Sequence, residues 1–225
     1  MGELKYKFTK ETISVDGNPL YRIEALKDFG DVKKGDKGGY VENEENLSQS
    51  GGCWVYPDAA VYGSAKVYGD AEVYDDAAVF GDAQVYGNAI VHGDTIVCGR
   101  AKIYGNAVVC DDAEVYENAV VHGEAQVYGH ALVYGNMEIY GNAWVYGDAE
   151  VLDNAKVFGN AKVFDDAQIY GDAIVCDNAQ IYGKAAVHDD AVVCDNAIVC
   201  DNAEVYEDAV VCGDMVICGN AVVYN

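Results

Sequence analysis

The sequence predicts an all-β fold, a single-stranded parallel β-helix whose short strands stack into a solenoid. A Val or Ile stands at every sixth position from Val55 to Val223, 29 times without interruption. The position two residues before each of them is Ala in 25 of the 29 cases. Residues two apart lie on one side of a strand, and six residues are too few for a helix or a hairpin. Each unit therefore forms one strand and one corner, and the strands pair in parallel.

The first part of the chain does not follow this repeat and is predicted to form a cap. Residues 4–28 alternate polar and apolar side chains around Asp16-Gly17, the usual signal for a β-hairpin. A turn-rich link and an irregular first coil should follow. We expect residues 1–52 to be this hairpin cap and first coil, closing one end of a β-helix of residues 53–225.

The repeating hexad reads Ala-x-Val-Tyr-Gly-Asp or Asn. Ala and Val should face the interior, which leaves x and the aromatic residue on the outside. Gly followed by Asp or Asn suits a corner, because these residues tolerate a positive φ. The repeat therefore predicts an interior of small and branched side chains and an exterior of aromatic and polar ones.

The hexad resembles the repeat of left-handed parallel β-helices, in which three hexads make one 18-residue coil; Val-Tyr-Gly-Asn-Ala is the matching frame. Residues 28–33, 38–41, 46–49 and 53–56 are also similar to the head of an uncharacterised bacterial and phage-borne β-helix family often labelled acyltransferase. The resemblance implies a left-handed triangular solenoid of about nine to ten coils. It also implies that acyl transfer is one function to consider.

The charge is strongly acidic and unevenly distributed. Fourteen Lys and Arg against 38 Asp and Glu give a net charge of −24, and residues 53–225 hold 28 of the acids but six of the bases. Such a surface repels nucleic acid and anionic lipid, so we expect direct binding to neither. A basic protein is the expected partner. No secretion signal or bilayer-length apolar run is visible, which predicts a cytoplasmic protein.

An 18-residue register gathers aspartates at one corner, which we call the acidic corner. Its members are Asp58, Asp75, Asp76, Asp94, Asp111, Asp112, Asp148, Asp165 and Asp166, with His130 and Lys184 in the same positions. Like charges stacked about 4.8 Å apart repel, so salt, a cation or a basic partner should screen them. Ca²⁺ is one candidate cation, but it needs six to eight oxygens. The sequence predicts no metal and no cofactor. A second corner is mostly Asn and should form a hydrogen-bonded column.

Outward columns of stacked rings, such as Tyr68, Tyr86, Tyr104, His122, Tyr140 and Phe158, should stiffen the sheets. In the last third, apolar and thiol side chains occupy the outside. The sequence predicts a homo-oligomer interface formed by Ile174, Cys176, Val192, Cys194, Ile198, Cys200, Val210, Cys212, Val216, Cys218, Val222 and Tyr224. The sequence stops in mid-repeat at Asn225, and an open coil edge favours pairing with another copy.

Seven of the eight cysteines occupy the position that is otherwise aromatic, so we interpret them as free thiols. The column of Cys176, Cys194 and Cys212 could bind a soft metal. It lacks the Cys-x-x-Cys pairs that are typical of zinc sites. We therefore predict no metal at these thiols.

Two functions remain open. The sequence favours a non-enzymatic acidic scaffold or protein-interaction module that self-associates and binds a basic partner, including a nucleic-acid-binding protein inhibited by DNA mimicry. The alternative, implied by the resemblance, is a CoA-dependent acyltransferase. The repeat contains no inserted loop, and its four His occupy ordinary repeat positions. No catalytic residue is assigned, although His122 and His130 are the candidate general bases.

Overall fold

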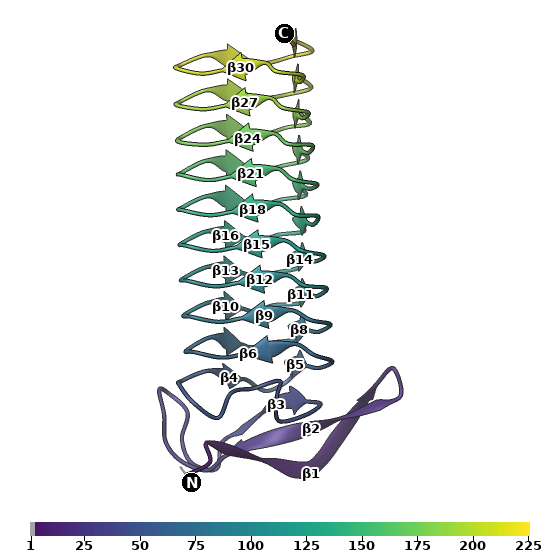
Figure 1. Cartoon of the computed structure of the whole chain (residues 1–225), viewed down its shortest axis with the longest axis vertical. Coiled ribbons are helices and arrows are strands. Elements are labelled where there is room, and N and C mark those ends of the chain that lie inside the picture. The colour runs from purple at the N-terminus through teal and green to yellow at the C-terminus, as the bar shows by residue number, and fades with distance from the viewer. Residues whose placement is uncertain (1–2) are drawn as a thin grey trace.

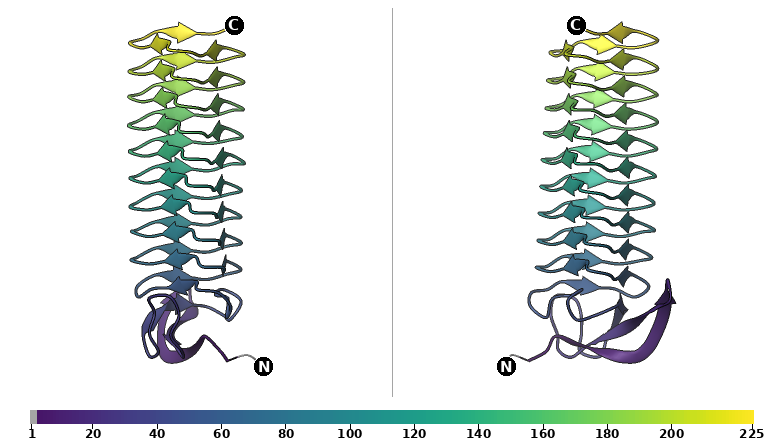
Figure 2. Two further views of the ribbon diagram at one scale, coloured as in Figure 1. Left: turned by 90° about the vertical axis from the view of Figure 1, so that its left-hand side faces the viewer. Right: turned by 45° about the vertical axis from the view of Figure 1, so that its right-hand side comes forward.

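The computed structural model describes residues 3–225 as a solenoid of stacked three-sided coils, with a β-hairpin head at its N-terminal end (Figure 1). Viewed from two further directions, the coils form a straight prism of constant width (Figure 2). Residues 3–225 contain no helix, and therefore none that could cross a membrane. The predicted all-β parallel solenoid with an N-terminal hairpin is confirmed.

Three sheets form the three faces of the prism, and we name them face A, face B and face C. Face A contains β1 (Tyr6–Val15), β2 (Asn18–Ala25), β3 (Lys37–Val41), β5 (Ala60–Val61), β8 (Ala78–Val79), β11 (Ile96–Val97), β14 (Glu114–Val115), β17 (Leu132–Val133), β20 (Glu150–Val151), β23 (Gln168–Ile169), β26 (Ala186–Val187), β29 (Glu204–Val205) and β32 (Val222–Val223).

Face B contains β4 (Trp54–Val55), β7 (Glu72–Val73), β10 (Ile90–Val91), β13 (Val108–Val109), β16 (Gln126–Val127), β19 (Trp144–Val145), β22 (Lys162–Val163), β25 (Gln180–Ile181), β28 (Ile198–Val199) and β31 (Val216–Ile217). Face C contains β6 (Lys66–Val67), β9 (Gln84–Val85), β12 (Lys102–Ile103), β15 (Val120–Val121), β18 (Glu138–Ile139), β21 (Lys156–Val157), β24 (Ile174–Val175), β27 (Val192–Val193) and β30 (Val210–Val211). The chain passes from face B to face A to face C within each coil.

Strand pairing shows that residues 18 apart stack. Val91 pairs with Val109, and Val109 pairs with Val127, all in parallel strands of face B. The Val or Ile of each strand and the preceding Ala are buried in almost every coil. Three hexads therefore make one coil, and the interior is a column of branched and small side chains.

The corners have the backbone conformation that the hexad predicts. Gly93 has a φ of 76°, and Asp75 and Glu117, at the same hexad position, have φ values of 56° and 60°. The corner between faces C and B carries the predicted asparagine column. Asn88 donates to Asn106 over 2.9 Å, and similar bonds at 3.0 to 3.2 Å run from Asn142 to Asn196. These amides link successive coils.

The head continues face A beyond the first coil. β1 and β2 pair as a hairpin whose turn is Asp16-Gly17, with φ values of 51° and 83°. β3 pairs antiparallel with β2 and parallel with β5, so the sheet turns directly from hairpin to solenoid. β3 packs closely against the first coil: a Cβ at Gly39 would lie 2.3 Å from the Ala59 carbonyl oxygen. Only glycine fits there.

Polar and aromatic contacts also hold the head against the first coil. The buried Lys5 Nζ donates to the Cys53 carbonyl oxygen at 2.8 Å and lies 5.2 Å from the centre of the Phe29 ring. The Tyr6 hydroxyl donates to the Leu47 carbonyl oxygen at 2.7 Å. Burial lowers the pKa of Lys5. The buried ammonium group is therefore satisfied by hydrogen bonds and a ring face.

Candidate functional site

The acidic corner lies between face B and face A, and all nine of its predicted aspartates are exposed. Asp75, Asp111 and Asp165 have a left-handed backbone, with φ values of 56°, 62° and 59°. Each of these carboxylates accepts a bond of 3.2 to 3.3 Å from the backbone N–H of a Gly 18 residues later. These three aspartates therefore stabilise coil stacking, which the sequence did not reveal.

Two histidines lie beside this corner. His92 Nδ1 is 3.6 Å from an Asp75 oxygen, and His130 Nδ1 is 3.6 Å from an Asp112 oxygen. The His130 side chain is 69% exposed, so it lies on the surface rather than in a pocket. It occupies the corner position that the sequence assigns to it.

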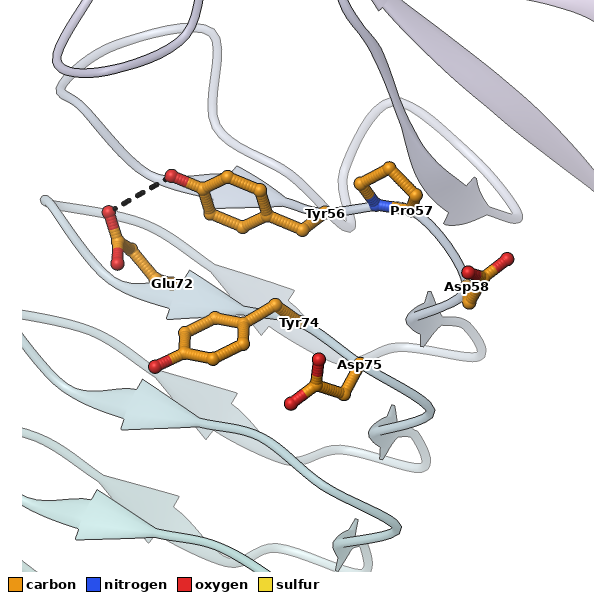
Figure 3. Close-up of a pocket in the computed structure, with 6 residues that line it drawn as sticks. All are labelled: Tyr56, Pro57, Asp58, Glu72, Tyr74 and Asp75. Atoms are coloured by element: carbon orange, nitrogen blue, oxygen red, sulfur yellow. Dashed lines mark hydrogen bonds between the residues drawn. The ribbon is translucent and has the colours of Figure 1, made fainter.

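The acidic corner is hollowed where it meets the head (Figure 3). A cavity of about 500 Å³ is lined by six residues from the first two coils, namely Tyr56, Pro57, Asp58, Glu72, Tyr74 and Asp75. Two aromatic rings and three carboxylates therefore surround one open volume. We call it the head hollow.

Ring geometry distinguishes the head hollow from the rest of the solenoid. The outward rings of later coils stack nearly parallel; Tyr68 and Tyr86 are 4.7 Å apart at an angle of 4°. Tyr56 and Tyr74 are instead 5.7 Å apart at 83°. The Tyr56 hydroxyl donates to Glu72 Oε1 at 3.3 Å, and burial followed by the Glu72 charge raises the pKa of Tyr56 to about 12.

Sequence reasoning did not single out this hollow. The available signal was Pro57, which replaces the Gly or acidic residue that otherwise turns the corner. Proline fixes its own φ and restricts the residue before it, which here is Tyr56. A break in a regular repeat is a reason to look for a site.

The candidate base His122 has a partner that the sequence did not predict. Its Nε2 lies 3.0 Å from Glu138 Oε1, and its ring stacks between Tyr104 and Tyr140. His188 has the same arrangement with Glu204, at 3.1 Å. The sequence signal for such a pair is a His followed 16 residues later by a Glu. The outward strand residue of the next coil stands 16 residues after the ring position, and it lies beside the ring. Neither His122 nor His188 lines the head hollow.

The residues predicted as one oligomer interface are distributed over all three faces. Face C carries Ile174, Cys176, Val192, Cys194, Val210 and Cys212, whereas face B carries Ile198, Cys200, Val216 and Cys218, and face A carries Val222 and Tyr224. Cys176 and Cys200 are buried, with 8% and 6% exposure. Self-association through this third of the chain stays a prediction.

Parts of the repeat are similar to known β-solenoid proteins. Residues 83–99, 125–137 and 167–183 match the family described as the YdcK beta solenoid repeat. The repeat is similar to that of YdcK. Over 42 residues the chain is 43% identical to the "Uncharacterized acetyltransferase YdcK" of Escherichia coli strain K12. That match covers 19% of this chain and 13% of the relative's length. It supports a β-solenoid with a distant relative that is named an acetyltransferase.

Proposed function

We propose that this protein is a rigid acidic scaffold that binds a basic protein partner, with the head hollow as the anchoring point. The observation that carries the proposal is that Asp58, Glu72 and Asp75 line one cavity together with two tyrosine rings. A guanidinium or ammonium group is attracted both to carboxylates and to ring faces. An Arg or Lys side chain therefore has the chemistry that fits this hollow.

The rest of the acidic corner extends the same surface along the prism. A second hollow of about 580 Å³ contains Asp148, Asp165, Asp166 and Lys184 among its lining residues. Carboxylates repeated on a stiff rod favour a partner with several spaced cations. A basic nucleic-acid-binding protein has this chemistry, and the DNA-mimic hypothesis is the corresponding special case.

A labelled oligo-arginine peptide tests the proposal by fluorescence anisotropy at low and high ionic strength. We expect binding that weakens steeply with salt. The triple variant Asp58→Asn, Glu72→Gln and Asp75→Asn should lower the affinity at least about tenfold, a loss of about 1.4 kcal/mol. The amide at position 75 can still accept the bond from Gly93, so the corner should keep its structure.

The matched control removes the same number of charges elsewhere. Asp172→Asn, Asp190→Asn and Asp208→Asn lie at exposed positions of the corner between faces A and C. This variant should keep the affinity within about threefold of the parent. Equal losses in the two triple variants would mean that only net charge matters, and the head hollow would not be the anchor.

Acyl transfer is the second candidate, favoured by the His122 and Glu138 pair and by the name of the relative. A carboxylate can orient an imidazole as a general base. Acetyl-CoA titration followed by thermal shift separates the two functions, since a ligand at 100 times its Kd stabilises by about 2.7 kcal/mol. The scaffold function predicts no shift; a shift, with turnover lost in His122→Ala, would establish the enzyme.

A further inference from the structure

Four cysteines in the last third of the chain form two pairs, each spanning adjacent coils. Cys194 and Cys212 follow β27 and β30 on face C, and Cys200 and Cys218 follow β28 and β31 on face B. Both pairs occupy the outward position that is aromatic in most other coils. Because the register stacks residues 18 apart, each pair brings two thiols together although they are far apart in sequence.

An aspartate completes each thiol pair. Sulfur and carboxylate oxygen atoms of Cys194, Asp195 and Cys212 all lie within 4.8 Å of one another. The corresponding atoms of Cys200, Asp201 and Cys218 do the same. The chain thus builds one constellation twice, on two different faces.

Backbone hydrogen bonds hold both carboxylates in place. The Gly213 N–H donates to Asp195 Oδ2 at 2.9 Å, and the Gly219 N–H donates to Asp201 Oδ2 at 3.0 Å. Each bond engages one carboxylate oxygen and leaves the other available. Fixing a ligand by an outer hydrogen bond is the usual support for a metal site.

We propose that these two constellations bind thiophilic divalent cations of the zinc class, each through two thiolates and one carboxylate. Tetrahedral coordination with Zn–S distances of about 2.3 Å and Zn–O distances of about 2.0 Å places donor atoms about 3.5 to 3.8 Å apart. The donor atoms now lie within 4.8 Å of one another, so modest rotation of the Cys and Asp side chains brings them to these tetrahedral spacings. Binding releases the two thiol protons, and the fourth position remains open for water.

Proximity in space takes the place of the Cys-x-x-Cys motif that the sequence lacks. The motif brings two thiols together within one loop, whereas here the 18-residue register does so across coils. The expectation of no metal at these thiols rested on the missing Cys-x-x-Cys pairs and did not include the carboxylates beside the column. Carboxylate and thiolate together also favour zinc over Ca²⁺ or Mg²⁺, which prefer oxygen ligands.

The chain contains a natural control for this proposal. Cys110 is followed by Asp111, whose carboxylate accepts a bond of 3.2 Å from Gly129, as Asp195 does from Gly213. One coil later, however, Tyr128 stands where the second thiol would be. Cys110 therefore has the carboxylate and the backbone support but lacks a thiol partner.

Titration of the fully reduced protein with Co²⁺, followed by thiolate-to-metal absorption and by competition with Zn²⁺, tests the proposal. We expect two ions per chain. Cys194→Ser and Cys200→Ser should each remove one ion, the double variant should remove both, and Cys110→Ser should leave both. Before each titration a thiol count excludes disulfides: eight in the parent protein, seven in each single serine variant and six in the double variant.

A variant designed to gain a metal site tests the proposal independently. Tyr128→Cys should create a third site with Cys110 and Asp111, and raise the stoichiometry to three ions per chain. Circular dichroism of every variant establishes that the solenoid is intact. Absence of thiolate-to-metal absorption in the parent protein, or unchanged binding in the double serine variant, overturns the proposal.

Discussion

Val109→Asp is expected to disrupt the middle of the solenoid. Val109 is fully buried and is stacked between Val91 and Val127 on face B. The interior there is apolar, so an aspartate would be desolvated without a partner and should cost more than about 4 kcal/mol. Because each coil contacts only its neighbours, the damage should separate two halves of the prism. Urea denaturation and limited proteolysis measure the loss.

The adjacent residue supplies the control. Val108 lies in the same strand, β13, but faces outward and stacks between Ile90 and Gln126, neither of which is charged. Val108→Asp should cost less than about 1 kcal/mol, as surface changes usually do. Similar losses for the two variants would contradict the inward and outward assignment of the hexad.

Alkaline pH is expected to destabilise the protein above about pH 10, the ordinary pKa of tyrosine. Burial raises the pKa of most tyrosines in the outward columns above 10.0, including Tyr68, Tyr86 and Tyr104. Between the unfolded and the folded pKa of these tyrosines, the unfolded chain has lost protons that the folded chain retains. Stability is therefore complete below the unfolded pKa and falls as pH rises through the folded pKa.

The charge balance reinforces this direction, since each tyrosinate adds to a net charge of −24. Lys5 acts in the opposite sense because burial lowers its pKa, but it is a single group. Far-UV circular dichroism and tyrosinate absorbance should change together. Tyrosinate absorbance appearing near pH 10 without a change in dichroism would contradict the prediction.

Tyr86→Phe with Tyr104→Phe is the matched variant for the alkaline experiment. Phenylalanine already occupies this column further along the prism, at Phe158, which stacks 4.8 Å from Tyr140. The variant keeps two stacked rings and removes two ionisable hydroxyls. Its unfolding midpoint should move to higher pH, while its stability near neutral pH should change little.

The hairpin turn and the coil register follow from local chemistry. Asp16-Gly17 adopts the positive φ values that such a turn needs, and residues 18 apart pair as the resemblance to left-handed β-helices implies. Local propensity and the inward Val row favour the same structure, which is why the fold was predictable. The asparagine column follows from the same register.

Side-chain contacts between successive coils are harder to predict from the sequence pattern. The pairing of His122 with Glu138, 16 residues later, depends on where a ring lies over the next strand. The role of Asp75 as a hydrogen-bond acceptor for Gly93 depends on the corner geometry. Neither relation is local in sequence, so composition and periodicity alone did not identify it.

What the sequence alone determined is the parallel solenoid and its inward Val row, because both depend on a regular period and on which side chains can be buried. The resemblance to left-handed β-helices supplied the 18-residue coil and with it the acidic corner. Only the tertiary structure decided which residues of the repeat come together to form a cavity or a candidate metal site. Tyr56, next to Pro57, lies at 83° to Tyr74 where the head hollow opens, and the register brings Cys194 and Cys212 together. Both depend on distances between successive coils, which are fixed only when the chain has wound upon itself.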